Sequence, residues 1–253
     1  MKRALDNTNL ELLKIICFWW VVTIAFASSG QISSNLNRHI RTDESKEKIV
    51  YTALKKGYIS LKAEIKLVDG ELRCPDNQKF EDIFLAPLLS RYQKNGERFY
   101  KNYAGLFYLF IESAEGDVNT LEALEKVLED YRGIVANTKW NTQRNRLKVV
   151  MVNPSAEVTE YILNQKLSLV AIEGNATNYD GAFDYLHMPV VGLDYDKLDQ
   201  SELPDIVSKL HRQAKKLRLY DVPDDQVLWD SLIKMGVDFI NVKESQQILA
   251  KLQ

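Results

Sequence analysis

Cysteine, proline and glycine are all scarce in this chain of 253 residues, which contains two cysteines, six prolines and eleven glycines. No stretch rich in proline, glycine or serine divides the chain after residue 30, so we expect one folded domain over residues 31–253. No glycine-rich phosphate-binding turn follows an early strand, and this absence argues against an open, doubly wound dinucleotide-binding fold.

A surplus of positive charge is also lacking. The chain has 33 basic and 35 acidic residues, which gives a formal net charge of −2 at pH 7. Proteins that bind nucleic acid usually present a basic face, so we expect no nucleic-acid partner. The lysines and arginines are interleaved with acids, and we interpret them as solvated helix faces.

The first 27 residues have the pattern of a secretory signal. Lys2 and Arg3 precede an uncharged apolar run of 13 residues, 15–27, and its last three residues are Ala-Phe-Ala, with small side chains where a signal peptidase acts. The run is shorter than the roughly 20 residues of a spanning helix. An uncleaved anchor, which Asp6 and Glu11 would suit, and a buried core helix are the alternatives; only an anchor implies membrane association. We expect a secreted, periplasmic or cell-envelope protein.

Removal of that segment would leave Cys74 as the one cysteine, because Cys17 lies within it. One cysteine cannot form an internal disulfide, and a domain of this size does not need one. Cys74 is then a reactive thiol, an intermolecular link or simply a tolerated residue.

Beyond residue 30, apolar β-type runs alternate with helical patterns. The runs occupy residues 59–68, 106–113, 147–152, 167–173, 189–193, 217–221 and 238–241, with a weaker one at 31–36. Helical patterns occupy 45–56, 81–94, 120–131, 155–165, 201–216, 224–235 and 243–251, with caps expected at residues 119–120 and 224–225 and glycines after two helices at 57 and 236. About eight such units predict an α/β fold with a single closed (β/α)8 TIM barrel.

Charged residues occur where barrel chemistry is expected, at the carboxyl ends of strands. Lys62, Glu64 and Lys66 share one face of the strand at 59–68. That face therefore lines a polar cavity, or the strand is partly exposed, because burying three charges is costly. Glu112 follows an almost unbroken apolar stretch in the run at 106–113, where it can cap a helix, pair with a lysine or serve a site.

Several segments together resemble those of a known superfamily. Residues 53–58 (Ala-Leu-Lys-Lys-Gly-Tyr), 67–72 (Leu-Val-Asp-Gly-Glu-Leu), 216–220 (Lys-Leu-Arg-Leu-Tyr), 223–224 (Pro-Asp) and 236–241 (Gly-Val-Asp-Phe-Ile-Asn) match its scaffold motifs. Residues 31–253 are similar to the glycerophosphodiester phosphodiesterase and phosphatidylinositol-specific phospholipase C (PLC-like) superfamily, in a divergent bacterial branch. The resemblance implies a TIM barrel with a phosphodiesterase site at its mouth.

The positions of the catalytic groups agree less well with the family pattern. By resemblance, the three carboxylate ligands of a divalent cation fall on Lys62, Glu64 and Glu112, so the first ligand is a lysine. His39 is the candidate for the first catalytic histidine. The second histidine would fall within residues 73–76, where Cys74 is a poor general acid unless its pKa is shifted.

Arg218 and Tyr220 are kept from the family pattern and suggest a retained anionic, phosphodiester or sugar-like ligand. Three hypotheses follow. The first is a degenerate barrel that binds a ligand or partner without turnover, with the Lys62 ammonium bridging the two carboxylates and no cofactor expected. The second is an active, divergent phosphodiesterase that uses His39, Glu64 and Glu112 with Mg²⁺ or Ca²⁺. The third is a structural envelope protein that keeps only the fold. The missing histidine favours the first and third.

We expect cleavage of the N-terminal segment after Ala27, because the small residues there follow a short apolar run. Intact-mass spectrometry of the exported protein checks this directly. A mass that includes residues 1–27 would show that the segment is retained as an anchor.

Overall fold

The computed structural model describes residues 38–40, 49–139, 146–179 and 183–242. Eight of its strands are parallel and form a closed barrel, because β1 pairs with β9 on one side and with β2 on the other. The strands are β1 (Arg38–Ile40), β2 (Ser60–Val68), β4 (Phe107–Ser113), β5 (Leu147–Met151), β6 (Val170–Gly174), β7 (Val190–Asp194), β8 (Lys216–Val222) and β9 (Phe239–Val242). The predicted (β/α)8 barrel is confirmed.

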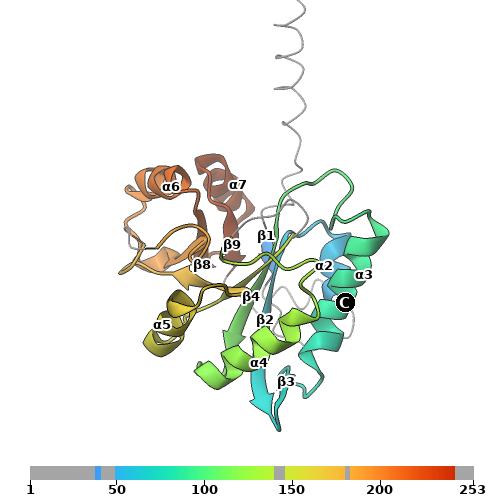
Figure 1. The fold of residues 1–253 in the computed structure, drawn as a ribbon. Helices are drawn as coiled ribbons and strands as arrows, with labels where there is room; N and C mark the ends of the chain where they lie inside the picture. The colour runs from blue at the N-terminus through green and yellow to red at the C-terminus, as the bar shows by residue number, and fades with distance from the viewer. Residues whose placement is uncertain (1–37, 41–48, 140–145, 180–182, 243–253) are drawn as a thin grey trace, which may run out of the picture. The chain divides into compact units, whose positions relative to one another are not determined.

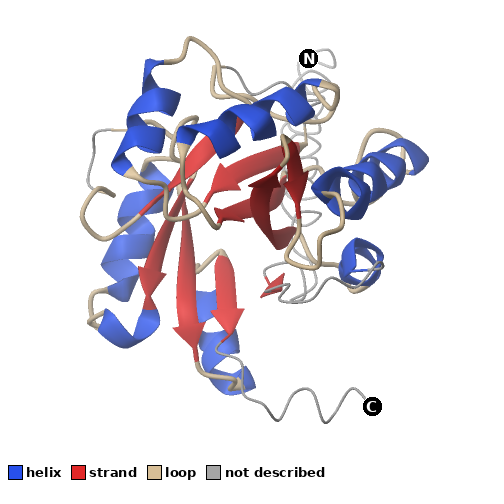
Figure 2. Ribbon diagram, turned by 90° about the horizontal axis from the view of Figure 1, so that it is seen from below, coloured by secondary structure: helices blue, strands red, loops and turns tan. Residues whose placement is uncertain are grey.

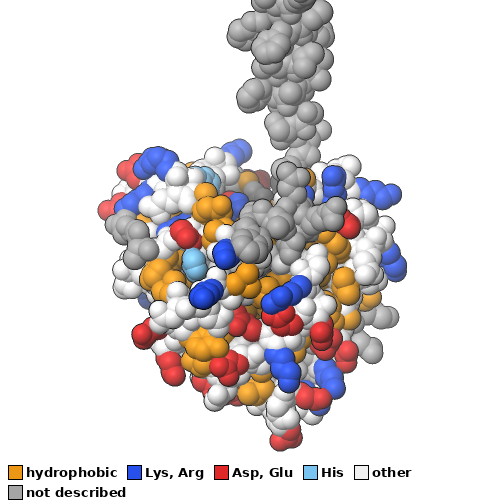
Figure 3. All heavy atoms as spheres, viewed as in Figure 1, with side chains coloured by type: hydrophobic (Ala, Val, Ile, Leu, Met, Phe, Trp, Pro, Cys, Tyr) orange, Lys and Arg blue, Asp and Glu red, His pale blue; other side chains and the backbone are white. Residues whose placement is uncertain are grey.

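The helices lie around the strands (Figure 1 and Figure 2). They are α2 (Ile49–Lys55), the π-helical turn η1 (Glu81–Leu85), α3 (Ala86–Lys94), α4 (Val118–Glu129), α5 (Ala156–Asn164), the 3-10 turn η2 (Tyr195–Lys197), α6 (Leu203–Arg212) and α7 (Gln226–Met235). The described residues between β6 and β7 contain no helix. None of the described helices is long and apolar enough to cross a membrane. Acidic and basic side chains are interspersed on the face shown in Figure 3.

Local signals explain where most helices begin and end. Asp225 caps α7 by accepting a hydrogen bond from the Val227 amide, as predicted, and Gly236 ends the same helix with a φ of 98°. The predicted cap of α4 at residues 119–120 is wrong, because Asp117 caps it by accepting from the Thr120 amide. An aspartate oxygen reaches the third amide of a new helix, so the cap lies before the apolar pattern begins.

A short antiparallel strand, β3 (Glu71–Arg73), was not predicted. It pairs with the end of β2, beyond the residues of β2 that pair with β4. The connecting turn has positive φ at both Asp69 (52°) and Gly70 (78°), as a type I′ hairpin requires. The hairpin therefore extends β2 past the barrel (Figure 1).

The interior of the barrel is divided into an apolar and a charged half. Aromatic and aliphatic side chains form one buried cluster, with the Phe239 ring 5.0 Å from that of Tyr108 and 5.5 Å from that of Phe110; its members are Ile59, Tyr108, Phe110, Val150, Val152, Ala171, Val190 and Phe239. The larger apolar cluster takes in the outward faces of the strands and the helices. Charged side chains continue the inward face toward the carboxyl ends of β2, β4, β6 and β8.

Several predictions fall outside the described residues: the signal segment, the strand at 31–36 and the helix at 243–251. The first barrel strand in the structure is β1.

Lys148, at the start of β5, is a buried cation whose ammonium donates to two backbone carbonyl groups. It is 4% exposed, and its Nζ donates to Leu186 O at 2.9 Å and to Asn137 O at 3.4 Å. Burial lowers the pKa of Lys148 to about 8, although Asp184 opposes the shift. Because the unfolded chain then binds more protons between pH 8 and about 10.5, the free energy of unfolding rises with pH through this window.

We therefore predict that replacing Lys148 by Met removes that rise. Between pH 7 and pH 10, urea unfolding of the natural protein should gain about 2 kcal/mol more than unfolding of Lys148→Met. The exposed Lys94→Met is the matched control and should follow the natural protein. Parallel pH profiles for the natural protein and Lys148→Met would contradict the assignment.

Candidate functional site

Two neighbouring strands bring charged side chains together at the mouth of the barrel. In the register of β2 and β4, Glu64 is opposite Glu112 and Lys62 is opposite Phe110. Side chains alternate along a strand, so Lys62, Glu64 and Glu112 share the inward face. The three residues that the resemblance places at the metal-ligand positions therefore do converge.

Lys62 joins the two carboxylates. It is 7% exposed, and its Nζ contacts Glu112 Oε2 and lies 3.6 Å from Glu64 Oε1. The predicted ion pair is present, and it compensates a charge that would be costly to bury alone. The side chains of Glu64 and Glu112 remain 34% and 38% exposed, so the carboxylates, rather than the ammonium, face solvent.

A second ion pair lies deeper in the barrel. The Arg218 guanidinium is fully buried, and its Nη1 donates to Oε1 of Glu173 at 3.0 Å. Its Cζ lies 4.3 Å from the centroid of the Phe110 ring and 4.5 Å from that of Tyr220. Ion pairing and two cation–π contacts therefore hold the guanidinium in a site that excludes water.

The Tyr220 hydroxyl donates to the second oxygen of Glu173. Burial raises the pKa of Tyr220 above its usual range, and the charge of Glu173 adds to the rise, so the phenol stays protonated and keeps donating. Gly192 makes the arrangement possible, because a Cβ there would lie 2.5 Å from the Tyr220 hydroxyl oxygen and 2.8 Å from Cδ of Glu173.

This cluster gives Arg218 and Tyr220 a partner within the barrel, and the expectation that they line a ligand site stays a prediction. Arg218 is enclosed and its Nη1 is engaged by Glu173, a residue that was missed at the sequence level. Its position could have indicated it, because Glu173 follows an apolar stretch near the end of a predicted strand, as Glu112 does.

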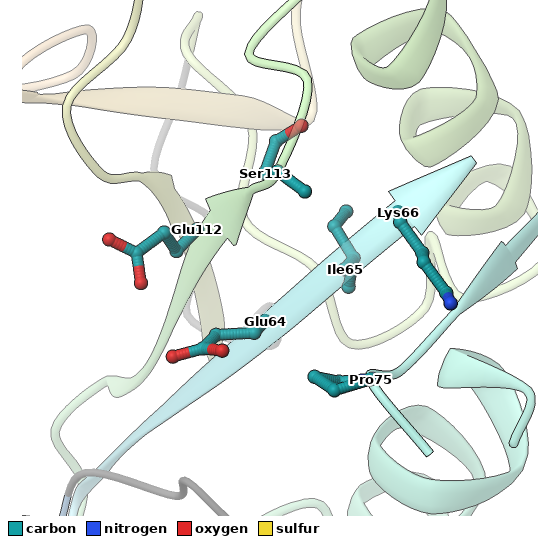
Figure 4. A pocket seen from close by; sticks show the side chains of 7 residues that line it. Glu64, Ile65, Lys66, Pro75, Glu112 and Ser113 are labelled. Carbon is teal, nitrogen blue, oxygen red and sulfur yellow. The ribbon is translucent and has the colours of Figure 1, made fainter. Parts of the chain in front are cut away.

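An open pocket of about 540 Å³ lies at the mouth, and we call it the mouth pocket. Its lining residues are Glu64, Ile65, Lys66, Pro75, Glu112, Ser113 and Ala114. The carboxylates of Glu64 and Glu112 point to the same side, and Lys66 points away from both (Figure 4). This volume falls within the range of roughly 300–1,000 Å³ that is usual for small-molecule sites.

Cys74 does not line the mouth pocket; its neighbour Pro75 does. The Cys74 side chain is 3% exposed in the outer apolar cluster, and its amide donates to Gln78 O. Burial raises the pKa of Cys74 to about 12, with a smaller contribution from Asp76. The thiol is therefore a protonated core group at neutral pH.

The histidines are distributed over different parts of the barrel. His39 is in β1, where its Cα partners are Ser60 and Asn241, and its side chain lies outside the described part. His187 Nδ1 is 2.9 Å from Asp184 Oδ1, and His211 Nε2 is 2.8 Å from Asp238 Oδ2. The catalytic role predicted for His39 stays a prediction.

The residues present do not fit the divalent cation that the resemblance implies. A cation of this kind needs several oxygen ligands, and the Lys62 ammonium lies between the two carboxylates that would supply them. Within the described ranges, no three His, Cys, Asp or Glu side chains form a group that could hold a metal ion.

The inner ion pair yields a stability prediction. Glu173→Gln leaves the Arg218 charge buried without its carboxylate, and we expect a loss of about 3–5 kcal/mol in the free energy of unfolding. Glu112→Gln is the matched control and should lose less, because the Lys62 ammonium is also near Glu64. Urea unfolding measures both, and equal losses would contradict a dominant inner pair.

Comparison with known proteins gives structural matches alone: no family model and no curated protein sequence matches the chain. A glycerophosphodiester phosphodiesterase from Parabacteroides distasonis is 18% identical, with a TM-score of 0.49 over 87% of this chain and 99% of that one. A putative glycerophosphoryl diester phosphodiesterase from Silicibacter pomeroyi is 12% identical, with a TM-score of 0.47 over 88% and 95%. A tryptophan synthase complex from Pyrococcus furiosus is 11% identical, with a TM-score of 0.42 over 82% and 86%. These matches are a likeness of fold.

Proposed function

We propose that this chain is a phosphodiesterase-like barrel that binds a small ligand in its mouth pocket without turning it over. The observation that carries the proposal is the buried Lys62 ammonium between Glu64 and Glu112. It occupies the place where phosphodiester chemistry in the resembling family would need a metal ion.

Three features of the chain support ligand binding without turnover. An ammonium group has no open coordination position to offer to a phosphate oxygen, so it cannot polarise the scissile bond as a metal ion does. The segment at 73–76 has no histidine, and loss of one general acid or base typically lowers the rate about 10²–10⁴-fold. Cys74 cannot replace it, because its thiol is buried and its pKa is raised.

The ligand proposal rests on what the pocket offers. Two carboxylates accept hydrogen bonds from vicinal hydroxyl groups, and Ile65, Pro75 and Ala114 give it apolar walls. These features favour a polyhydroxyl or sugar-like ligand over a phosphorylated one, since Arg218 is enclosed. With the N-terminal signal pattern, we propose that binding takes place outside the cytoplasm.

We predict that the natural protein binds Ca²⁺ weakly in calorimetry and hydrolyses glycerophosphodiesters only at the background rate. Lys62→Glu should bind Ca²⁺ at least tenfold more tightly and melt higher when Ca²⁺ is added, because it supplies a third carboxylate. It should still hydrolyse nothing, because the missing histidine is not restored.

Lys94→Glu is the matched control, since it makes the same change of charge at an exposed position of α3 that does not line the mouth pocket. It should change Ca²⁺ affinity little. If Lys62→Glu fails to fold, Lys62→Gln removes the ammonium without adding a charge and should still bind Ca²⁺ more tightly than the natural protein. Metal-dependent hydrolysis by the natural protein would overturn the proposal and make His39 a catalytic candidate again.

A further inference from the structure

The mouth pocket exposes carboxylate oxygens more than it exposes ammonium groups. Of its charged lining residues, Glu64 and Glu112 aim their carboxylates to the same side, while Lys66 turns away from them (Figure 4). The Lys62 ammonium is 7% exposed and lies against both carboxylates, so a ligand meets the oxygens first.

The deeper charges do not reverse this balance. Glu173 and Arg218 pair with each other and are 3% and 0% exposed. The two therefore neutralise each other, while the oxygens exposed at the mouth pocket belong to Glu64 and Glu112. In a partly enclosed site, exposed carboxylate oxygens attract a cation and repel a phosphate more strongly than they would in open water.

The mouth pocket has room for a positively charged group that belongs to a small organic ligand. Each carboxylate is about one-third exposed, so both keep oxygen surface for a further donor. Ile65, Pro75 and Ala114 can contact a carbon skeleton, and the pocket of about 540 Å³ has room for one.

We infer that the ligand of the mouth pocket is a small hydroxylated organic amine, whose ammonium group sits on Glu64 and Glu112. This inference rests on the proposed binding function and specifies that its ligand is positively charged. The ligand's ammonium completes the charge balance that Lys62 begins, and its hydroxyl groups donate to the remaining carboxylate oxygens.

The test uses matched compounds that share a carbon skeleton and differ in one charged or neutral group. Glucosamine, glucose and glucose 6-phosphate form one set, and benzylamine, benzyl alcohol and benzyl phosphate form a second. Ligand-observed NMR titration of the natural protein at pH 7 should rank the amine of each set about tenfold tighter than the alcohol, because a charge-assisted hydrogen bond is added. The phosphate should bind most weakly.

Substitutions then locate the binding. Glu64→Gln should reduce the amine to the affinity of the alcohol, whereas Glu64→Asp should keep the preference. Glu64→Gln leaves Lys62 in contact with Glu112, so the barrel should fold, and circular dichroism melting checks this. Glu160→Gln makes the same change on the exposed face of α5 and should alter nothing.

The two proposals fail in different ways. Tightest binding of the phosphates, or an amine preference that survives Glu64→Gln, would overturn the cationic ligand and leave ligand binding intact. No saturable binding by any of the six compounds to the natural protein would overturn both proposals.

Discussion

The Lys62 ammonium is the group on which the mouth of this barrel depends. Closure of the barrel fixes the register of β2 and β4, and that register places Glu64 opposite Glu112 on the inward face. Two carboxylates held side by side would repel each other in a partly buried site. Lys62, two residues before Glu64 on the same face, reaches both, so β2 itself supplies the neutralising charge.

Deeper in the barrel, buried charges are neutralised by a different set of contacts. Arg218 is enclosed by aromatic rings and balanced by Glu173, with Tyr220 donating to that carboxylate and Gly192 leaving room for both. The two clusters are close enough for the charge of Glu112 to raise the pKa of Tyr220. The charged half of the interior is thus a connected set of ion pairs above an aromatic half.

The fold could be predicted from the sequence because strand and helix periods alternate clearly and glycines follow two helices. The meeting of Lys62 with Glu64 and Glu112 could also be predicted, because alternation along a strand and strand-end position are local properties. The burial of Arg218 and Cys74 could not, since it depends on packing partners far apart in the chain. Arg218 in β8 pairs with Glu173 in β6, on the other side of β7 and 45 residues away in the sequence, and no periodicity encodes that pairing.

The charge that a ligand meets at the mouth depends on which groups are exposed, and not only on the net charge of the site. Two carboxylates with one ammonium carry the same formal charge, −1, as three carboxylates with a divalent cation. A metal ion that keeps an open coordination position presents positive charge to a ligand. The Lys62 ammonium is instead buried beneath the carboxylates of Glu64 and Glu112, and it is far less exposed to solvent than they are. One lysine in a ligand position therefore changes the charge that the pocket presents while leaving the barrel and its overall charge unchanged.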